Sequence, residues 1–387
     1  MGDATHPDSF VAAGFEPVAA EFERNFSERG ELGAAFAATV DGELVVDLWG
    51  GIADRESGRP WQRDTLQVIF SGTKGLVAVC VLLLIERGEI GLETRVAERW
   101  PEFGAAGKEQ VTVRELVTHT ARLPGFAEPV TMADLTDDRR AAALLAAQPR
   151  FDDPRAVRCY HPLTYGWLLG ELVRRVDGRS IGRFFAEEVA APLDLEVFIG
   201  LPAEHEPRVS RLALAESWPT LPIFMPGEVA GDALASAAWQ NPPVWAWETF
   251  PWNSREFHAA EIPGAGGIAT ARSLAKLYGR LEQVLAPETL ALAATELERR
   301  VDGYGPPEET LEDVFGVGFM LQSELMEMGP PADAFGHGGA GGSMHGRWPG
   351  LGVGFSYAMN MMHDDFPAAD PRSDALLTAL HESLGPG

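Results

Sequence analysis

The feature that most constrains the fold is a long apolar stretch near residue 80. Every residue from Gly75 to Ile85 is small or hydrophobic, which predicts a helix that is buried on nearly all of its sides. The chain has 387 residues, enough for one large domain or two closely joined ones with a full core. The stretch ends in Glu86-Arg87 after eleven apolar residues, which is too short to span a bilayer.

A serine and a lysine stand at the entrance of this predicted helix. Ser71 precedes Lys74 by three residues, and residues three apart on a helix share a face, so the hydroxyl and the amine can meet. A poorly solvated lysine favours its neutral form and can then accept a proton. Lysine is rare in this chain, occurring at Lys74, Lys108 and Lys276. The spacing indicates a Ser–Lys nucleophile pair; the alternative is a capped helix whose lysine extends its amine to solvent.

Composition bounds the partners and the compartment. Lys and Arg number 31 against 57 Asp and Glu, a net charge of −26, which argues against binding to nucleic acid or to an anionic membrane. The N-terminal residues have no basic segment followed by an apolar one, so we expect no secretory signal. Two cysteines, Cys80 and Cys159, make no disulfide framework. We therefore expect a cytoplasmic protein that acts on a small molecule.

Strand patterns lie at both ends of the chain, with helical patterns between them. Two β-like runs flank Asp41-Gly42, a strong hairpin signal. We expect strands at 34–40, 43–49, 314–321, 343–348 and 352–362, and helices at 10–29, 75–85, 132–147, 160–176, 181–189, 270–284 and 372–384. This order predicts an α+β fold in which one antiparallel sheet is built from both chain ends and flanked by helices, with a mostly helical region inserted.

The same order suggests two parts. Residues 1–90 and 311–387 are expected to form the part that contains the sheet. Residues 91–310 are expected to form a largely helical part with long loops rich in Pro and Trp, of which 196–263 is the most irregular. We expect the active site at the interface between the two parts.

Two further segments can carry chemistry. Tyr160 lies next to a predicted helix start; a phenol beside a lysine ammonium loses its proton more easily and can pass it to a leaving group. Taken alone, a half-buried tyrosine is the simpler interpretation. Residues 335–343 include five glycines, so another backbone or a ligand can approach closely. Their N–H groups can face an oxyanion, or the segment is simply a tight turn.

In this order, Ser71-Gly-Thr-Lys74, Tyr160 and His337-Gly338-Gly339 resemble the serine β-lactamase and penicillin-binding-protein superfamily, closest to its class C-like branch, the family VIII carboxylesterases. The resemblance covers residues 15 to 384 or so and includes the stretches 116–125 and 160–170. It implies a β-lactamase-like fold, no cofactor, Ser71 as acylated nucleophile, Lys74 as its base and Tyr160 as proton relay. It also implies an oxyanion hole made by the N–H groups of Ser71 and Ala340.

Two departures from the family pattern bear on the substrate. The tyrosine motif often ends in Asn, where this chain has Pro162; the usual Lys-Thr-Gly is replaced by His337-Gly338-Gly339. That Lys-Thr pair helps the family's β-lactamases and peptidases to hold a carboxylate. Its loss favours neutral esters, with His337, Gly338 and Gly339 still expected to contact substrate. The expectation is a serine carboxylesterase; acyl transfer to an alcohol or amine and β-lactamase or peptidase activity remain open.

Several other interpretations carry less weight. Ser343 would be the nucleophile of an α/β-hydrolase, but Gly341-Gly-Ser-Met-His345 does not match G-x-S-x-G. No His-Glu-x-x-His or Cys-x-x-Cys occurs, so we expect no metal. The protein could also be a non-catalytic scaffold, but a scaffold would not need all three motif positions to be intact. Four tryptophans, Trp245, Trp247, Trp252 and Trp348, are candidates for an aromatic wall around the substrate, with Trp252 and Trp348 preferred; some of the four are expected to belong to the core.

Overall fold

A computed structural model describes residues 4–216, 218, 231–246, 249–304, 311–363 and 369–385. Its helices are α1 (Glu16–Glu28), α2 (Thr73–Glu86), α3 (Val96–Arg99), α4 (Val113–Val117), α5 (Met132–Thr136), α6 (Asp138–Ala147), α7 (Thr164–Asp177), α8 (Ile181–Phe185), α9 (Ala233–Trp239), α10 (Arg255–Ala259), α11 (Ala271–Gly279), α12 (Pro287–Ala293) and α13 (Pro371–Ser383). Its strands are β1 (Phe10–Val11), β2 (Gly33–Val40), β3 (Glu43–Asp54), β4 (Arg59–Pro60), β5 (Gln67–Val68), β6 (Val197–Ile199), β7 (Ala213–Leu214), β8 (Gly267–Ala269), β9 (Glu298–Val301), β10 (Glu312–Phe315), β11 (Met320–Leu321), β12 (Phe335–Gly339), β13 (Ser343–Trp348), β14 (Val353–Met359) and β15 (Met361–Met362).

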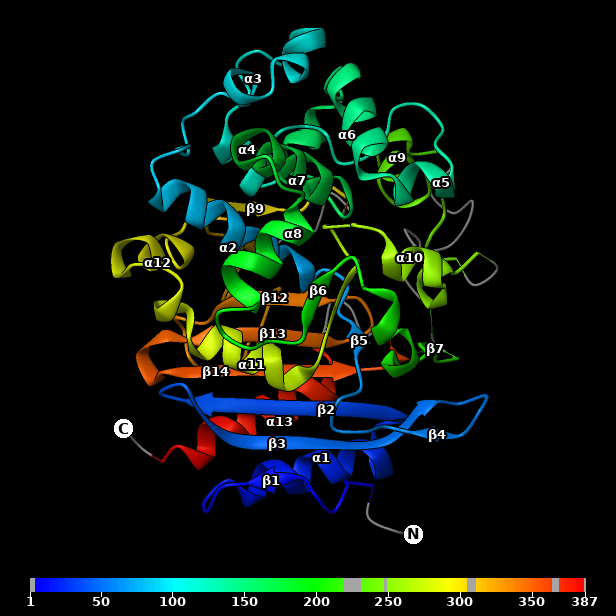
Figure 1. The fold of residues 1–387 in the computed structure, drawn as a ribbon, viewed down its shortest axis with the longest axis vertical. Coiled ribbons are helices and arrows are strands. Elements are labelled where there is room, and N and C mark those ends of the chain that lie inside the picture. Colours follow the sequence, from blue (N-terminus) through cyan, green and yellow to red (C-terminus); the bar gives the residue numbers. More distant parts are fainter. Residues whose placement is uncertain are drawn as a thin grey trace.

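The main sheet joins the two ends of the chain. In the described residues it has ten strands in the order β1-β3-β2-β14-β13-β12-β11-β10-β9, with β4 beside β3, and every pair is antiparallel. Figure 1 shows β2 and β3, in blue, directly beside β14 and β13, in orange. Where β2 from the N-terminal end meets β14 from the C-terminal end, Ala37 pairs with Ser356. The predicted α+β fold with a sheet built from both chain ends is confirmed.

The predicted hairpin opens the sheet. Asp41 and Gly42 form the turn between β2 and β3, with φ angles of 50° and 78°. Positive φ at both central residues is typical of the tight turn that matches the twist of antiparallel strands, and Asp-Gly suits it. The turn therefore sets the pairing next to it, and the register shifts once further along, between Ala38 and Thr39.

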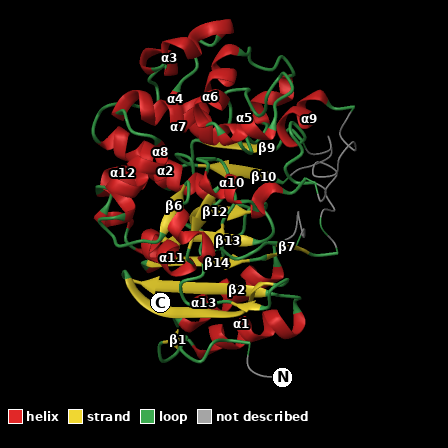
Figure 2. Cartoon of the chain, turned by 45° about the vertical axis from the view of Figure 1, so that its right-hand side comes forward, coloured by secondary structure: helices red, strands yellow, loops and turns green. Residues whose placement is uncertain are grey.

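Helices cover both faces of the sheet. On one face, Val18 and Phe22 of α1 and Leu376 of α13 share a core with Phe355 and Tyr357 of β14. On the other face, α11 packs on β14 so closely that an ideal Cβ at Gly354 would lie 2.2 Å from the Gly279 nitrogen. Figure 2 shows α1 and α13 beneath the sheet and the group α3 to α7 at the far end of the molecule.

Helix α2 runs through the centre of the fold. All residues from Thr73 to Leu84 are buried, and α2 contacts α7, α8, α12 and β12. A helix with no polar face is stable only when it is enclosed in this way. The prediction of a helix buried on nearly all sides is confirmed, and its N-terminus points into the middle of the molecule.

Some elements differ from expectation. The helix expected at 132–147 is two helices, because the side chains of Thr131 and Asp137 each cap a new start. The helix expected at 160–176, with a break near its start at Pro162, begins at Thr164, since the residue before a proline avoids the helical region. Strand β9 and helix α11 belong to the sheet layer although both fall in the range expected to be helical, so the chain returns to the sheet earlier than residue 311.

The described part of the chain contains no helix that is both long and apolar enough to traverse a bilayer. Helix α2, the most apolar of the long helices, has 14 residues, whereas about 20 are needed.

Candidate active site

Ser71 lies at the entrance of α2. The residue before it, Phe70, has a φ of 45°, which is uncommon for a bulky side chain and is seen where the surrounding structure forces a sharp turn. Ser71 itself is half-buried. Its Oγ lies 3.1 Å from Nζ of Lys74, so the three-residue spacing brings hydroxyl and amine together as predicted.

Lys74 is fully buried, with 0% of its surface exposed. Its Nζ donates to the carbonyl oxygens of Pro162 and Gly264, both at 2.7 Å. Within the described chain no carboxylate forms an ion pair with it. Burial lowers the pKa of Lys74 well below its ordinary value, because a charge without a partner is poorly solvated there.

All three partners of Nζ can accept a hydrogen bond, so the contacts fit an ammonium as well as a neutral amine. A neutral amine has two N–H groups and one lone pair. In the neutral form, which burial favours, the carbonyls of Pro162 and Gly264 take the two N–H groups and the lone pair is left for the hydroxyl of Ser71. In this state Lys74 can accept the proton of Ser71 directly.

Tyr160 completes the group of polar side chains. Nζ of Lys74 lies 4.6 Å from the centre of its ring. Burial raises the pKa of Tyr160 well above its ordinary value, although a hydrogen bond with Ser71 opposes the shift. The expectation that a lysine ammonium eases the loss of this proton stays a prediction, because burial shifts Lys74 toward its neutral form by lowering its pKa. Tyr160 holds its proton and is ready to donate it.

His337 faces Tyr160 from strand β12. It is 2% exposed, and burial lowers its pKa to about 3, so the ring is neutral. Its Nδ1 lies 2.7 Å from the carbonyl oxygen of Gly338 and its Nε2 lies 3.4 Å from the Tyr160 hydroxyl. Because Nδ1–H donates to the carbonyl, Nε2 is an acceptor. His337 therefore supplies no positive charge to a substrate.

The end of β12 approaches the turn before Ser71. An ideal Cβ at Gly339 would lie 2.4 Å from the carbonyl oxygen of Ile69, so the close approach requires glycine here. Gly338, Gly339 and Ala340 are half-buried. In the described structure neither the N–H of Ser71 nor that of Ala340 donates to another residue. Both are available to a ligand.

Two tryptophans expected to contact the substrate do not line a cleft. Trp252 is 1% exposed and donates from Nε1 to the Val244 carbonyl at 3.0 Å; it packs against Phe70 at 5.2 Å between ring centres. Trp348 is 0% exposed and donates to Met328 on the face that carries α1 and α13. Both expectations are wrong, because each side chain is part of the core.

The other aromatic candidates differ in position. Trp245 is buried against Trp252, and Trp247 lies outside the described residues. Trp239, at the end of α9, was not predicted; it is half-buried, with ring centres 6.4 Å from Tyr160 and 5.8 Å from Tyr304. Two aromatic neighbours, Trp239 and Tyr304, thus come to this site from α9 and from the segment after β9.

Two histidines support Tyr160 from behind. The N–H of His161 donates to Nδ1 of His119 at 3.1 Å, and His119 packs against the Tyr160 ring at 4.6 Å between centres. Burial lowers the pKa of His119 and brings that of His161 to about 3. His119 is a packing residue, as expected, and both cysteines are free and buried.

The alternative nucleophile Ser343 has no base. It is 2% exposed, and its Oγ has no hydrogen-bond partner in the described structure. Its strand, β13, is antiparallel to both neighbours, unlike the parallel sheet of an α/β-hydrolase. Among the residues described, no group of three His, Cys, Asp or Glu side chains is arranged to hold a metal ion.

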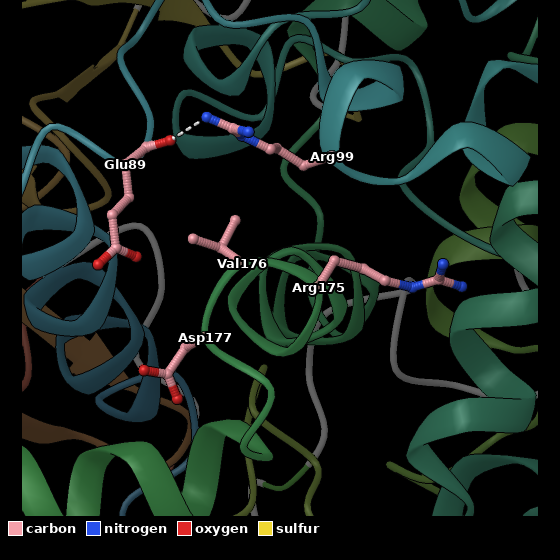
Figure 3. A pocket seen from close by; sticks show the side chains of 5 residues that line it. All are labelled: Glu89, Arg99, Arg175, Val176 and Asp177. Atoms are coloured by element: carbon pink, nitrogen blue, oxygen red, sulfur yellow. Dashed lines mark hydrogen bonds between the residues drawn. The ribbon is translucent and has the colours of Figure 1, made fainter.

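A surface pocket of about 340 Å³ lies elsewhere (Figure 3). Glu89, Arg99, Arg175, Val176 and Asp177 line it, and Arg99 donates to the carbonyl of Glu89 at 2.7 Å. Glu89 follows the C-terminal end of α2, about 20 Å along the helix from Ser71 at 1.5 Å per residue. The pocket contains no part of the Ser71 site.

Comparison with known proteins places these motifs in a family. A model described as Beta-lactamase matches residues 19–379. The chain is 34% identical over 375 residues to "Esterase/beta-lactamase LipL" of Mycobacterium tuberculosis, covering 90% of this chain and 81% of that protein. A solved family VIII carboxylesterase superposes with a TM-score of 0.85 at 36% identity, covering 98% and 99% of the two chains. A penicillin-binding-protein homologue from Caulobacter crescentus also gives 0.85, at 37% identity and the same coverage.

Proposed function

This chain belongs to the beta-lactamase family, and from that premise we propose that it is a serine hydrolase that cleaves neutral carboxylic esters through an acyl-serine intermediate. The relatives named esterase and carboxylesterase support ester cleavage. The observation that carries the proposal is the environment of Lys74: its side chain is fully buried, and its Nζ is held by two carbonyls at 3.1 Å from Oγ of Ser71.

Acylation begins at Ser71. Its proton passes to Nζ of Lys74 while Oγ attacks the ester carbonyl carbon. The carbonyl oxygen becomes an oxyanion, for which the free N–H groups of Ser71 and Ala340 are the donors. When the bond to the alcohol breaks, Tyr160 gives its proton to the departing oxygen and regains one from the Lys74 ammonium.

Deacylation reverses these steps with water. Water gives a proton to Lys74 by way of Tyr160 and attacks the acyl carbon, and Ser71 leaves with the returned proton. An alcohol or amine in place of water would yield acyl transfer by the same route, so acyltransferase activity is the second candidate. The carbonyl groups of Pro162 and Gly264 keep Lys74 in position in both half-reactions.

The charge of the site supports neutral substrates. His337 occupies the place of the family's lysine, and it is neutral and acts as an acceptor toward Tyr160. In the described part of the site no arginine contacts Ser71, Tyr160 or His337. The net charge of −26 adds a field that disfavours anionic substrates. In the described part of the site, the carboxylate of a β-lactam therefore meets neither an arginine nor a charged His337.

We also propose the setting of the enzyme. Ser71, Lys74 and β12 come from the expected sheet part (1–90 and 311–387), whereas Tyr160 and Gly264 come from the expected helical part (91–310), so the site lies where the two parts meet. The free thiols of Cys80 and Cys159 support a cytoplasmic location. The expected substrate is a small ester, without a nucleic-acid or membrane partner.

The test is hydrolysis of p-nitrophenyl acetate and butyrate by the wild type and by Ser71→Ala. We expect turnover by the wild type and loss of at least about 1,000-fold in kcat in the variant. Product ratios with added alcohol or amine distinguish hydrolysis from transfer. Absence of both a burst and turnover in the wild type would refute the proposal.

A further inference from the structure

Tyr160 lies in a loop, so no helix or strand fixes its backbone. Helix α7 begins four residues later, at Thr164, and the preceding turn ends at Arg158. Proton transfer needs donor and acceptor within about 2.6–3.2 Å, so a relay residue in a loop needs its backbone fixed by other parts of the chain.

The segment Arg300–Tyr304, which ends β9 and continues past it, supplies that support. The N–H of Tyr160 donates to Oδ2 of Asp302 at 3.3 Å, and the hydroxyl of Tyr304 donates to the carbonyl of Tyr160 at 3.0 Å. Both polar groups of the Tyr160 backbone are thus bound by side chains of this one segment.

The same segment also holds Arg158, two residues before Tyr160. The carbonyl of Arg158 accepts from the N–H of Gly303 at 3.1 Å and from Nε of Arg300 at 3.0 Å. An ideal Cβ at Gly303 would lie 2.7 Å from both the Arg155 carbonyl oxygen and the Cys159 Sγ. Glycine at 303 therefore allows the two backbones to approach.

The supporting side chains are themselves ordered. The second carboxylate oxygen of Asp302, Oδ1, accepts from the N–H of Tyr304 at 2.8 Å. Arg300 is 4% exposed; it lies over the Phe315 ring at 4.6 Å and donates to the Thr118 carbonyl. Thr118 precedes His119, whose ring packs against Tyr160. The backbone and the ring of Tyr160 are fixed by connected groups.

We propose that Asp302 and Tyr304 are positioning residues that align the Tyr160 hydroxyl with the oxygen of the leaving alcohol. This inference rests on the proposed ester hydrolysis. In the step concerned, the ester C–O bond and the Tyr160 O–H bond break, a new O–H bond forms on the alcohol, and the Lys74 ammonium returns a proton to Tyr160. Activation of Ser71 does not depend on this alignment, because Nζ of Lys74 contacts Oγ directly.

The leaving group provides the test. An alkoxide must be protonated as it departs, whereas p-nitrophenolate leaves without a proton. Ethyl butyrate and p-nitrophenyl butyrate form the same acyl-enzyme, and kcat/KM reports the acylation half-reaction. For Tyr304→Phe and Asp302→Asn we expect kcat/KM to fall at least about tenfold on the ethyl ester and less than about threefold on the nitrophenyl ester, since general acid catalysis contributes about 10²–10⁴-fold.

A matched control removes a phenolic oxygen elsewhere. Tyr278 on α11 is buried, and its hydroxyl has no hydrogen-bond partner in the described chain, so Tyr278→Phe should change neither ester by more than about twofold. Equal losses on both esters, or no loss on either, in Tyr304→Phe and Asp302→Asn would overturn the inference. A wild type that cleaves neither ester would instead refute the proposed function.

Discussion

The contact between α7 and the loop that holds Lys74 gives a sharp prediction. Gly166 on α7 faces residues 263–264, and an ideal Cβ there would lie 2.0 Å from the Gly264 nitrogen and 2.3 Å from the Pro263 carbonyl carbon. Ordinary contact begins at 3.4 Å. Gly166→Ala must therefore move the loop by about 1.4 Å, and both neighbours are backbone atoms that cannot rotate away.

The displaced loop carries one of the two acceptors of Lys74. The Gly264 carbonyl receives Nζ at 2.7 Å, so a shift of this size breaks the bond and frees the amine to turn from Ser71. Misplacement by about 1 Å costs about 100-fold in rate, and overpacking costs about 1–3 kcal/mol of stability. We expect a fall of about 100-fold in kcat/KM for p-nitrophenyl butyrate in a protein that still unfolds cooperatively.

Gly170→Ala is the matched control, one turn along the same helix. Its Cβ would meet side-chain atoms, Ile181 Cγ2 at 3.3 Å and Pro263 Cγ at 3.5 Å, and alanine is the better helix former by about 1 kcal/mol. We expect its activity within about twofold of wild type. Gly166→Ala with wild-type activity and an unchanged unfolding midpoint would show that the loop does not position Lys74.

Three further predictions follow from buried polar groups. Lys74→Met should lower kcat/KM by about 10²–10⁴-fold. In the wild type, kcat/KM should rise with pH as Lys74 loses its proton and should level off below pH 10.5, because the neutral amine is the active form and burial lowers the pKa of Lys74. His337→Lys should raise nitrocefin hydrolysis relative to p-nitrophenyl butyrate hydrolysis by at least about tenfold, since a charge-assisted hydrogen bond contributes about 1.5–3 kcal/mol; an unchanged ratio would contradict the neutral-site account. Arg372→Met should destabilise the fold by about 3–5 kcal/mol in denaturant unfolding, because it removes the ion-pair partner of the buried Glu31 and a donor to the Gly341 carbonyl; a loss below about 1 kcal/mol would contradict this.

Patterns that act locally were enough to predict much of the fold. The Asp41-Gly42 turn follows from the φ angles that these residues tolerate, and the apolar run after Ser71 can only be a buried helix. The Ser71–Lys74 contact follows from helical spacing. These features depend on neighbours in the sequence, so a single sequence contains them.

The groups that hold the site together could not be predicted in the same way. Pro162 and Gly264 act through backbone carbonyls, which every residue has, so the side chain gives no signal. Asp302 and Tyr304 reach Tyr160 across more than 140 positions. Such contacts depend on tertiary packing, which local patterns do not specify.

The error at Trp348 was avoidable. Side chains alternate along a strand, so His345 and Trp348 on β13 must face opposite sides of the sheet. His345 is paired with His337 in the register, on the face toward α2. Since 343–348 is already expected to be a strand, placing His345 on the face of the site assigns Trp348 to the opposite face. Trp252 gave no such signal, because it lies in an irregular segment.

The central claim is that Ser71, activated by a neutral Lys74, is the residue that becomes acylated. Labelling with a fluorophosphonate, followed by peptide mass spectrometry, tests it most directly. We expect one adduct, on the peptide that contains Ser71, at a rate that falls by about 10²–10⁴-fold in Lys74→Met. An adduct on Ser343, or labelling of Ser71 at an equal rate without the lysine, would contradict the account.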